Sequence, residues 1–138
     1  MRSTMKKIYL LIIAVFVLAA CTPAAAPSLA GEWQLVSYGS ATSPTPADPN
    51  IDTSIVFDSE KISGNMGCNQ FNGGYTLEEN NIVFSPFIST KMACIGNASV
   101  QESAALSVFA GAATFSLNGD TLTVTSADGA SVIVLARK

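Results

Sequence analysis

The sequence has 138 residues, no histidine and a formal net charge of −3. This length is enough for one domain. The lack of histidine excludes Ser-His-Asp and Cys-His catalysis, and it removes the commonest zinc ligand. We therefore expect a chain that is not an enzyme, with no catalytic residues, no bound metal and no other cofactor.

The first 20 residues have the order of an export signal. Residues 1–7 carry three basic side chains and no acid, and residues 8–20 form an apolar run. A run needs about 20 residues to cross a bilayer, so this one predicts a cleaved signal peptide over residues 1–20. It ends in Leu-Ala-Ala-Cys21, which resembles the bacterial lipobox. That resemblance implies cleavage before Cys21 and attachment of a lipid to this cysteine.

The mature chain is strongly acidic. The signal peptide contains three of the seven basic residues and none of the ten acidic ones, which leaves four against ten, a net charge of −6. Such a chain is a poor partner for nucleic acid or for anionic lipid head groups. We expect its membrane contact to be the lipid on Cys21, because multiple acyl chains anchor a protein stably. The expected location is the cell envelope: the outer membrane facing the periplasm in a Gram-negative cell, and otherwise the outer face of the cell membrane.

Pro, Ala and Ser dominate residues 22–30. We therefore assign residues 21–30 to the lipidated cysteine and a flexible tether, and residues 31–138 to one folded domain. Short stretches rich in aromatic and β-branched residues then alternate with turn sequences, which is typical of strands. The predicted strands are 31–38, 54–57, 62–63, 75–79, 82–84, 113–117, 122–124 and 132–135.

Residues 39–50 contain three prolines and no periodicity. They predict a loop that is long for a small domain, and binding functions are often found on such loops. Asp48 and Asp52 flank this segment and suggest a calcium site only weakly, because an ordered ligand loop is missing. Six further acids lie at or beside predicted turns, where solvated side chains are the rule: Asp58, Glu60, Glu78, Glu79, Asp120 and Asp128.

One helix is expected between the two groups of strands. Ser99 and Glu102 have the spacing of a capping box, in which the hydroxyl accepts a hydrogen bond from the Glu102 N–H and the carboxylate reaches back. The helical face that follows consists of Glu102, Ala105, Leu106 and Phe109. Gly111 can end the helix. A helix this short is marginal alone, so we expect it to pack on the sheet.

About eight short strands leave no room for parallel crossover connections, so the strands should be antiparallel. Closing them into a barrel removes exposed strand edges. The predicted fold class is mainly β: a small antiparallel β-barrel with one short α-helix packed on it.

Two blocks interrupt the strand pattern. Residues 64–75, Gly-Asn-Met-Gly-Cys-Asn-Gln-Phe-Asn-Gly-Gly-Tyr, contain four glycines, and residues 89–94 read Ser-Thr-Lys-Met-Ala-Cys. With residues 102–106 they resemble the motifs of the META domain family of HslJ-like bacterial lipoproteins. The matching positions are Gly64, Gly67, Cys68, Asn69, Gly73, Tyr75, Thr90, Met92, Cys94 and Glu102. The glycines suit kinks in a curling sheet better than a phosphate loop, which would need a Lys-Ser/Thr ending and a following helix.

The resemblance implies a barrel of lipocalin-like topology and a non-catalytic role in stress tolerance or envelope maintenance. The family has no agreed catalytic residues that could be assigned here. Two alternatives stay open. The barrel could carry a small apolar ligand in an open cavity. The domain could instead bind a protein, for example as a protease inhibitor, through residues 39–50. The sequence names neither a protein nor a small-molecule partner.

Cys68 and Cys94 remain as an even pair once Cys21 carries lipid. In an exported chain such a pair predicts a disulfide. A redox-active pair is one alternative, although the close Cys-x-x-Cys spacing is missing. Two buried free thiols are the other alternative.

Gly31-Glu32-Trp33 resembles the Gly-x-Trp of lipocalin first strands, in which an arginine of the last strand packs across the indole. Arg137 is the only arginine of the mature chain and lies at its end. We therefore predict a cation–π contact that closes the barrel between Trp33 and Arg137. The alternative is that Trp33 is simply a core residue.

Overall fold

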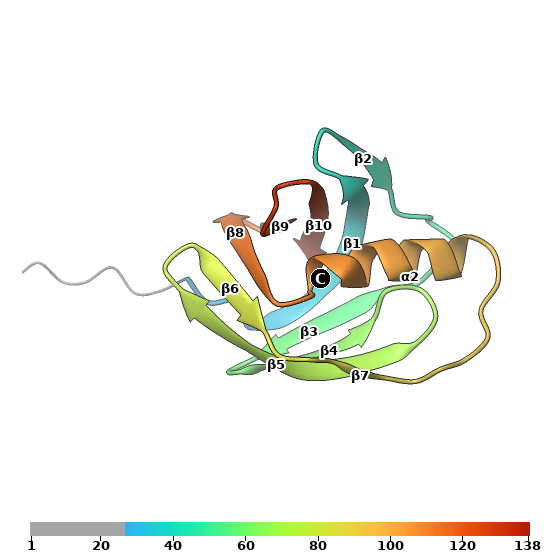
Figure 1. Ribbon diagram of the computed structural model, residues 1–138, viewed down its shortest axis with the longest axis horizontal. Coiled ribbons are helices and arrows are strands. Elements are labelled where there is room, and N and C mark those ends of the chain that lie inside the picture. The colour runs from blue at the N-terminus through green and yellow to red at the C-terminus, as the bar shows by residue number, and fades with distance from the viewer. Residues whose placement is uncertain (1–26) are drawn as a thin grey trace, which may run out of the picture.

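The computed structural model describes residues 27–138, which form a closed antiparallel β-barrel with one helix beside it (Figure 1). The eight barrel strands are β1 (Gly31–Ser40), β3 (Ser54–Asp58), β4 (Lys61–Asn65), β5 (Gln70–Glu78), β6 (Asn81–Phe84), β8 (Ala112–Asn118), β9 (Thr121–Ser126) and β10 (Ser131–Arg137). Each pairs with the next around the barrel, and β10 pairs with β1 to close it. The predicted fold class is confirmed. The predicted signal peptide and Cys21 lie outside the described residues.

Side chains alternate between the interior and the surface of the barrel. On β9, Leu122 and Val124 are completely buried, whereas Thr121 is exposed. The largest fully buried apolar side chains are Leu29, Trp33, Ile55, Phe57, Ile62, Met66, Phe71, Ile82, Leu122, Ile133 and Leu135. They belong to one cluster that fills the barrel. Burying each of them stabilises the fold by about 1.5–3 kcal/mol, so this cluster is the main source of stability.

The two ends of the barrel differ. At the first, which we term the hairpin end, tight turns join the strands at residues 58–61, 78–81 and 118–121, and Gly31 and Arg137 lie beside them. The second, the loop end, carries the 66–69 turn and the long connection 85–96. In Figure 1 this connection sweeps from β7 (Ile88–Ser89) around one side of the barrel to the helix.

The folded domain begins before residue 31. Leu29 is only 1% exposed, and its carbonyl oxygen accepts a hydrogen bond of 2.9 Å from the indole N–H of Trp33. Leu29 and Ala30, which the composition assigns to the tether, therefore belong to the barrel.

The predicted loop at residues 39–50 is wrong in part, because it contains strand β2 (Ser43–Pro46), which folds back along β1. Its two prolines, Pro44 and Pro46, make this strand look like a loop in the sequence. The N–H of Ala47 bonds to Val36 O, so residues 43, 45 and 47 face β1 while Pro44 and Pro46 face the free edge. Proline is tolerated at such an edge because its missing N–H has no partner there.

The helix α2 spans Asn97–Val108 and begins three residues earlier than a cap at Ser99 implies. Its N-cap is Gly96, and no side chain caps it, so the predicted capping box is wrong. Its buried face consists of Gln101, Glu102, Ala105 and Val108. In the part of the chain that the structure describes, no helix is long and apolar enough to cross a membrane.

Two motif glycines are required by close approach of other atoms. A Cβ on Gly64 would lie 1.9 Å from the carbonyl oxygen of Ser54, and its φ of +144° disfavours other residues. A Cβ on Gly73 would lie 2.2 Å from a ring carbon of Phe87. The glycine-rich block therefore lets neighbouring segments pack directly on the barrel wall.

Candidate functional site

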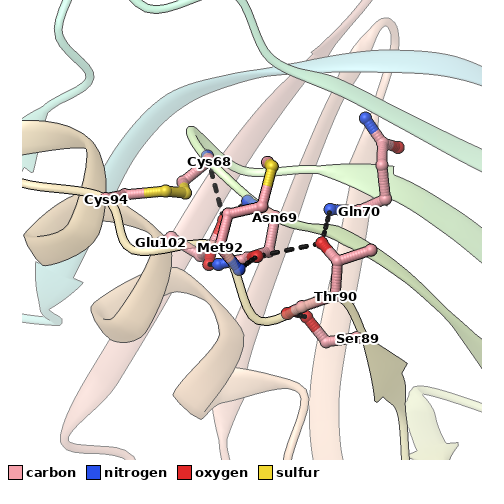
Figure 2. The surroundings of a disulfide bond; sticks show 8 residues. All are labelled: Cys68, Asn69, Gln70, Ser89, Thr90, Met92, Cys94 and Glu102. Carbon is pink, nitrogen blue, oxygen red and sulfur yellow. Dashed lines mark hydrogen bonds between the residues drawn. A yellow bond between two sulfur atoms is a disulfide. The ribbon is translucent and has the colours of Figure 1, made fainter.

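Most of the motif residues meet at the loop end of the barrel (Figure 2). Cys68 in the 66–69 turn and Cys94 in the long connection form a disulfide, with Cα atoms 6.1 Å apart. This separation lies within the usual range for a disulfide. The predicted pairing is confirmed, and the bond ties the β4–β5 turn to the segment that leads into α2.

Glu102 of α2 holds the same turn through its carboxylate. One oxygen accepts hydrogen bonds from the backbone N–H groups of Cys68, at 2.9 Å, and of Asn69. The other oxygen accepts from the side-chain amide of Asn69 at 2.8 Å. The carboxylate that the sequence assigns to a capping box therefore turns away from its own helix. Three hydrogen bonds from one turn stabilise the carboxylate more than a single N–H at the helix start would. Hydrogen bonds to charged groups are stronger than those between neutral groups.

Asn69 carries the network on to the long connection. Its side-chain oxygen accepts from the N–H of Met92 at 2.8 Å and from the hydroxyl of Thr90 at 2.9 Å. The Thr90 hydroxyl in turn accepts from the N–H of Gln70 at 3.1 Å. We term Cys68, Asn69, Thr90, Cys94 and Glu102 the clamp.

Gln101 is a site residue that the sequence pattern does not predict. It is 0% exposed, its Nε2 donates to the carbonyl of Met66 at 2.8 Å, and its Oε1 accepts from the N–H of Asp48 at 2.9 Å. Gln101 thus links the helix to the turn and to the segment after β2. No sequence pattern predicts these contacts of Gln101, because both partners are backbone groups that lie far away along the chain.

The remaining motif positions surround the clamp or lie in the wall. A Cβ on Gly67 would lie 3.0 Å from the carbonyl oxygen of Ala98, so the turn packs closely on α2. Tyr75 is buried in the core against Phe57, with ring centroids 5.2 Å apart. Burial, aided by the charge of Asp58, raises the pKa of the Tyr75 phenol. Met92 is exposed and contributes to the clamp through its backbone N–H.

The second predicted contact closes the hairpin end. Trp33 and Arg137 are register partners on β1 and β10, and the guanidinium carbon lies 4.2 Å from the centre of the indole ring. Arg137 also donates to the carbonyl of Ala30 at 2.8 Å and lies 3.4 Å from the carboxylate of Asp120. Trp33 is therefore both a core residue and the platform for the predicted cation–π contact.

The two acids beside the proline-rich segment have separate partners. Asp48 accepts hydrogen bonds from Asn50 and Asn97, and these bonds, led by the backbone N–H of Asn50, lower its pKa. Asp52 lies 3.8 Å from the amino group of Lys138. Among residues 27–138 no three Cys, Asp or Glu side chains gather as a metal-binding group.

A closed eight-stranded barrel with a helix and a disulfide at one end defines a small, lipocalin-like β-barrel domain. The chain belongs to the META domain family, whose model matches residues 27–138. A protein from Burkholderia xenovorans solved by NMR is similar in fold, with a TM-score of 0.65, 18% identity, and coverage of 85% of this chain and 94% of that one. Another NMR structure gives a TM-score of 0.58 at 22% identity, covering 78% of this chain and 88% of that one. At these identities the likeness concerns the fold alone. No curated protein matches this chain.

Proposed function

We propose that the chain is a non-catalytic, lipid-anchored protein of the cell envelope that serves stress tolerance or envelope maintenance. The lipobox ending in Cys21 supports the anchor, and membership of the META family supports the envelope role. The anchor and the envelope role depend on different parts of the chain, so each can be tested separately.

The observation that carries the proposal is the clamp. Its reactive groups are all engaged with one another, since the two sulfurs share a disulfide and the Glu102 carboxylate accepts three hydrogen bonds. A carboxylate held in this way braces the turn and is poorly placed to accept a proton from a substrate. Disulfides of this kind persist in exported proteins, which agrees with the predicted route through the signal peptide.

The barrel interior favours this role over that of a ligand carrier. A carrier needs an open cavity, whereas Trp33, Phe57 and Phe71 lie completely buried in the cluster that fills this barrel.

The free edge of β2 disfavours partners that would add a strand to the sheet there. Pro44 and Pro46 give that edge no N–H donors, and strand addition depends on main-chain hydrogen bonds.

The anchor is tested by labelling cells with a radioactive fatty acid. We expect the wild-type chain to carry label, to begin at Cys21 and to partition with membranes, whereas Cys21→Ala stays unlabelled and unprocessed. A deletion strain should lose tolerance to heat or envelope stress, and the wild-type gene should restore it. A wild-type protein recovered as an unlipidated soluble chain would overturn the proposal.

A further inference from the structure

The most exposed large apolar side chains of residues 27–138 are concentrated in one segment. Those exposed by more than half are Ile88 (73%), Met92 (58%), Ile95 (90%) and Val100 (63%). All lie between the start of β7 and the first turn of α2: three on the connection that sweeps around the loop end and Val100 in the helix itself (Figure 1). By contrast, the exposed valines of the barrel wall, Val36, Val56 and Val83, are 38–45% exposed and lie on separate strands. We term residues 88–100 the apolar segment.

The charge of the apolar segment also sets it apart. Residues 85–101 contain Lys91 and no acid, within a mature chain of net charge −6. The hairpin end is more acidic: its exposed acids are Glu32, Asp58, Glu60, Glu78, Glu79 and Asp120, against the basic Lys61, Arg137 and Lys138. Asp48 borders the segment, where its carboxylate accepts a hydrogen bond from Asn97. An anionic surface would therefore repel the hairpin end most strongly and the apolar segment least.

The chain length before the barrel limits how far the domain can move from an anchored Cys21. Eight peptide units separate Cys21 from the buried Leu29, which span at most about 28 Å when fully extended. The ten-residue β1 is about 33 Å long, or about 25 Å along the axis of a barrel with ordinary strand tilt. The tether is thus long enough for the barrel to lie along the bilayer, and it keeps Leu29 within about 28 Å of the anchored Cys21.

We propose that the apolar segment docks on the bilayer that holds the lipid anchor, with Met92 and Ile95 entering its interface. This inference rests on the proposed anchoring at Cys21. Exposed apolar side chains with a neighbouring lysine suit the boundary between head groups and acyl chains. The anchor keeps the segment at a high effective concentration near the membrane, so a few side chains are sufficient. A standard protein interface uses about 20–30 residues a side, far more than this segment offers.

The test uses the mature, lipidated protein reconstituted into phosphatidylcholine vesicles that contain brominated acyl chains, which quench indole emission on contact. Ile95→Trp places an indole in the apolar segment, and Val83→Trp places a matched indole on the β6 wall. Trp33 is completely buried and forms a constant background. We expect the indole at position 95 to lose most of its emission and the indole at position 83 to lose little. Adding Met92→Asp to Ile95→Trp should restore the emission.

Equal or negligible quenching at the two positions, in protein that floats with the vesicles, would overturn the docking and leave the apolar segment facing solvent, where a protein partner could bind it. Emission at position 95 that Met92→Asp leaves quenched would also count against it. Protein that does not float with the vesicles would refute the lipid anchor, and the docking fails with it. The two proposals therefore fail in different ways.

Discussion

The hairpin end and the loop end of the barrel are fastened by different means. At the hairpin end, turns between adjacent strands leave little loop entropy to overcome, and the Trp33–Arg137 contact joins the first strand to the last. At the loop end, the 85–96 connection must be brought back to a turn more than 20 residues earlier in the chain, and a disulfide and a charged hydrogen-bond network do so. Longer loops cost more entropy to close, so stronger fastenings are found where the connections are longest.

Removing the disulfide should have the largest effect. The variant Cys68→Ala/Cys94→Ala releases a cross-link with a sequence separation of 26. We expect the free energy of unfolding to fall by about 3–4 kcal/mol, because the unfolded chain regains the entropy of the open loop. Urea denaturation measures this, with the reduced wild-type protein as the matched comparison. A loss below about 1 kcal/mol would mean that the loop end does not depend on the cross-link.

Replacing the clamp carboxylate should have the next largest effect. Glu102→Gln keeps the size of the side chain but presents an amide NH₂ group to N–H donors of the turn. We expect a loss of about 2–3 kcal/mol, since the hydrogen bonds to a charged group are lost and a partly buried donor is left without an acceptor. The exposed Glu78 provides the control, and Glu78→Gln should change the stability by less than about 0.5 kcal/mol.

Alternation of apolar and polar residues predicts most of the barrel strands, because each strand buries one face in the same core. It does not predict the glycine-rich first half of β5, residues 70–74. At the clamp, a local pattern gave a wrong prediction. Ser99 and Glu102 have capping-box spacing, but the carboxylate finds donors on Cys68 and Asn69, more than 30 residues away. Such long-range partners are absent from any local pattern. Gln101 was missed for the same reason, and β2 because prolines at a free edge look like a loop.

A pair of variants tests the close contact between Gly73 and Phe87 in the barrel wall. Gly73→Ala places a methyl group 2.2 Å from the Phe87 ring, and overpacking of this kind costs about 1–3 kcal/mol. Phe87→Leu should relieve part of the clash when the two changes are combined. Thermal unfolding of the four proteins in this cycle gives the coupling between the two positions. Strict additivity would show that Phe87 does not press on Gly73.

At the hairpin end, Arg137→Gln should cost about 0.5–2 kcal/mol through the lost contact with the indole. The change should also shift the fluorescence of Trp33, because the charge over its ring is removed. Arg137→Lys keeps the charge but loses the planar group, so it should recover only part of the stability. A fully stable Arg137→Gln protein would leave Trp33 as a core residue and nothing more.

The smallest expected effect is a difference between the two ends of the barrel in how added salt changes the pKa of an acid. The pKa of Glu32 at the hairpin end is lowered first by the hydrogen bond from Lys138, then by the Ser54 hydroxyl and by the charge of Lys138. The pKa of Asp128 at the loop end is lowered chiefly by the Ser126 hydroxyl. A lowered pKa contributes stability above the unfolded value, 4.5 for Glu and 3.8 for Asp, and this is lost as the pH falls through the folded value. Added salt screens charge, so NMR titration should show the pKa of Glu32 rising while that of Asp128 changes little. Equal salt shifts would remove the distinction.

Above all, the motif residues fasten the loop end of the barrel. Amide hydrogen exchange in Glu102→Gln tests this claim most directly, because the N–H groups of Cys68 and Asn69 bond to the carboxylate itself. We predict that protection is lost at these two amides and at Met92, whose N–H bonds to Asn69, while the β1–β10 amides beside Trp33 keep theirs. Unchanged protection at Cys68 and Asn69, or an equal loss at both ends, would contradict the claim.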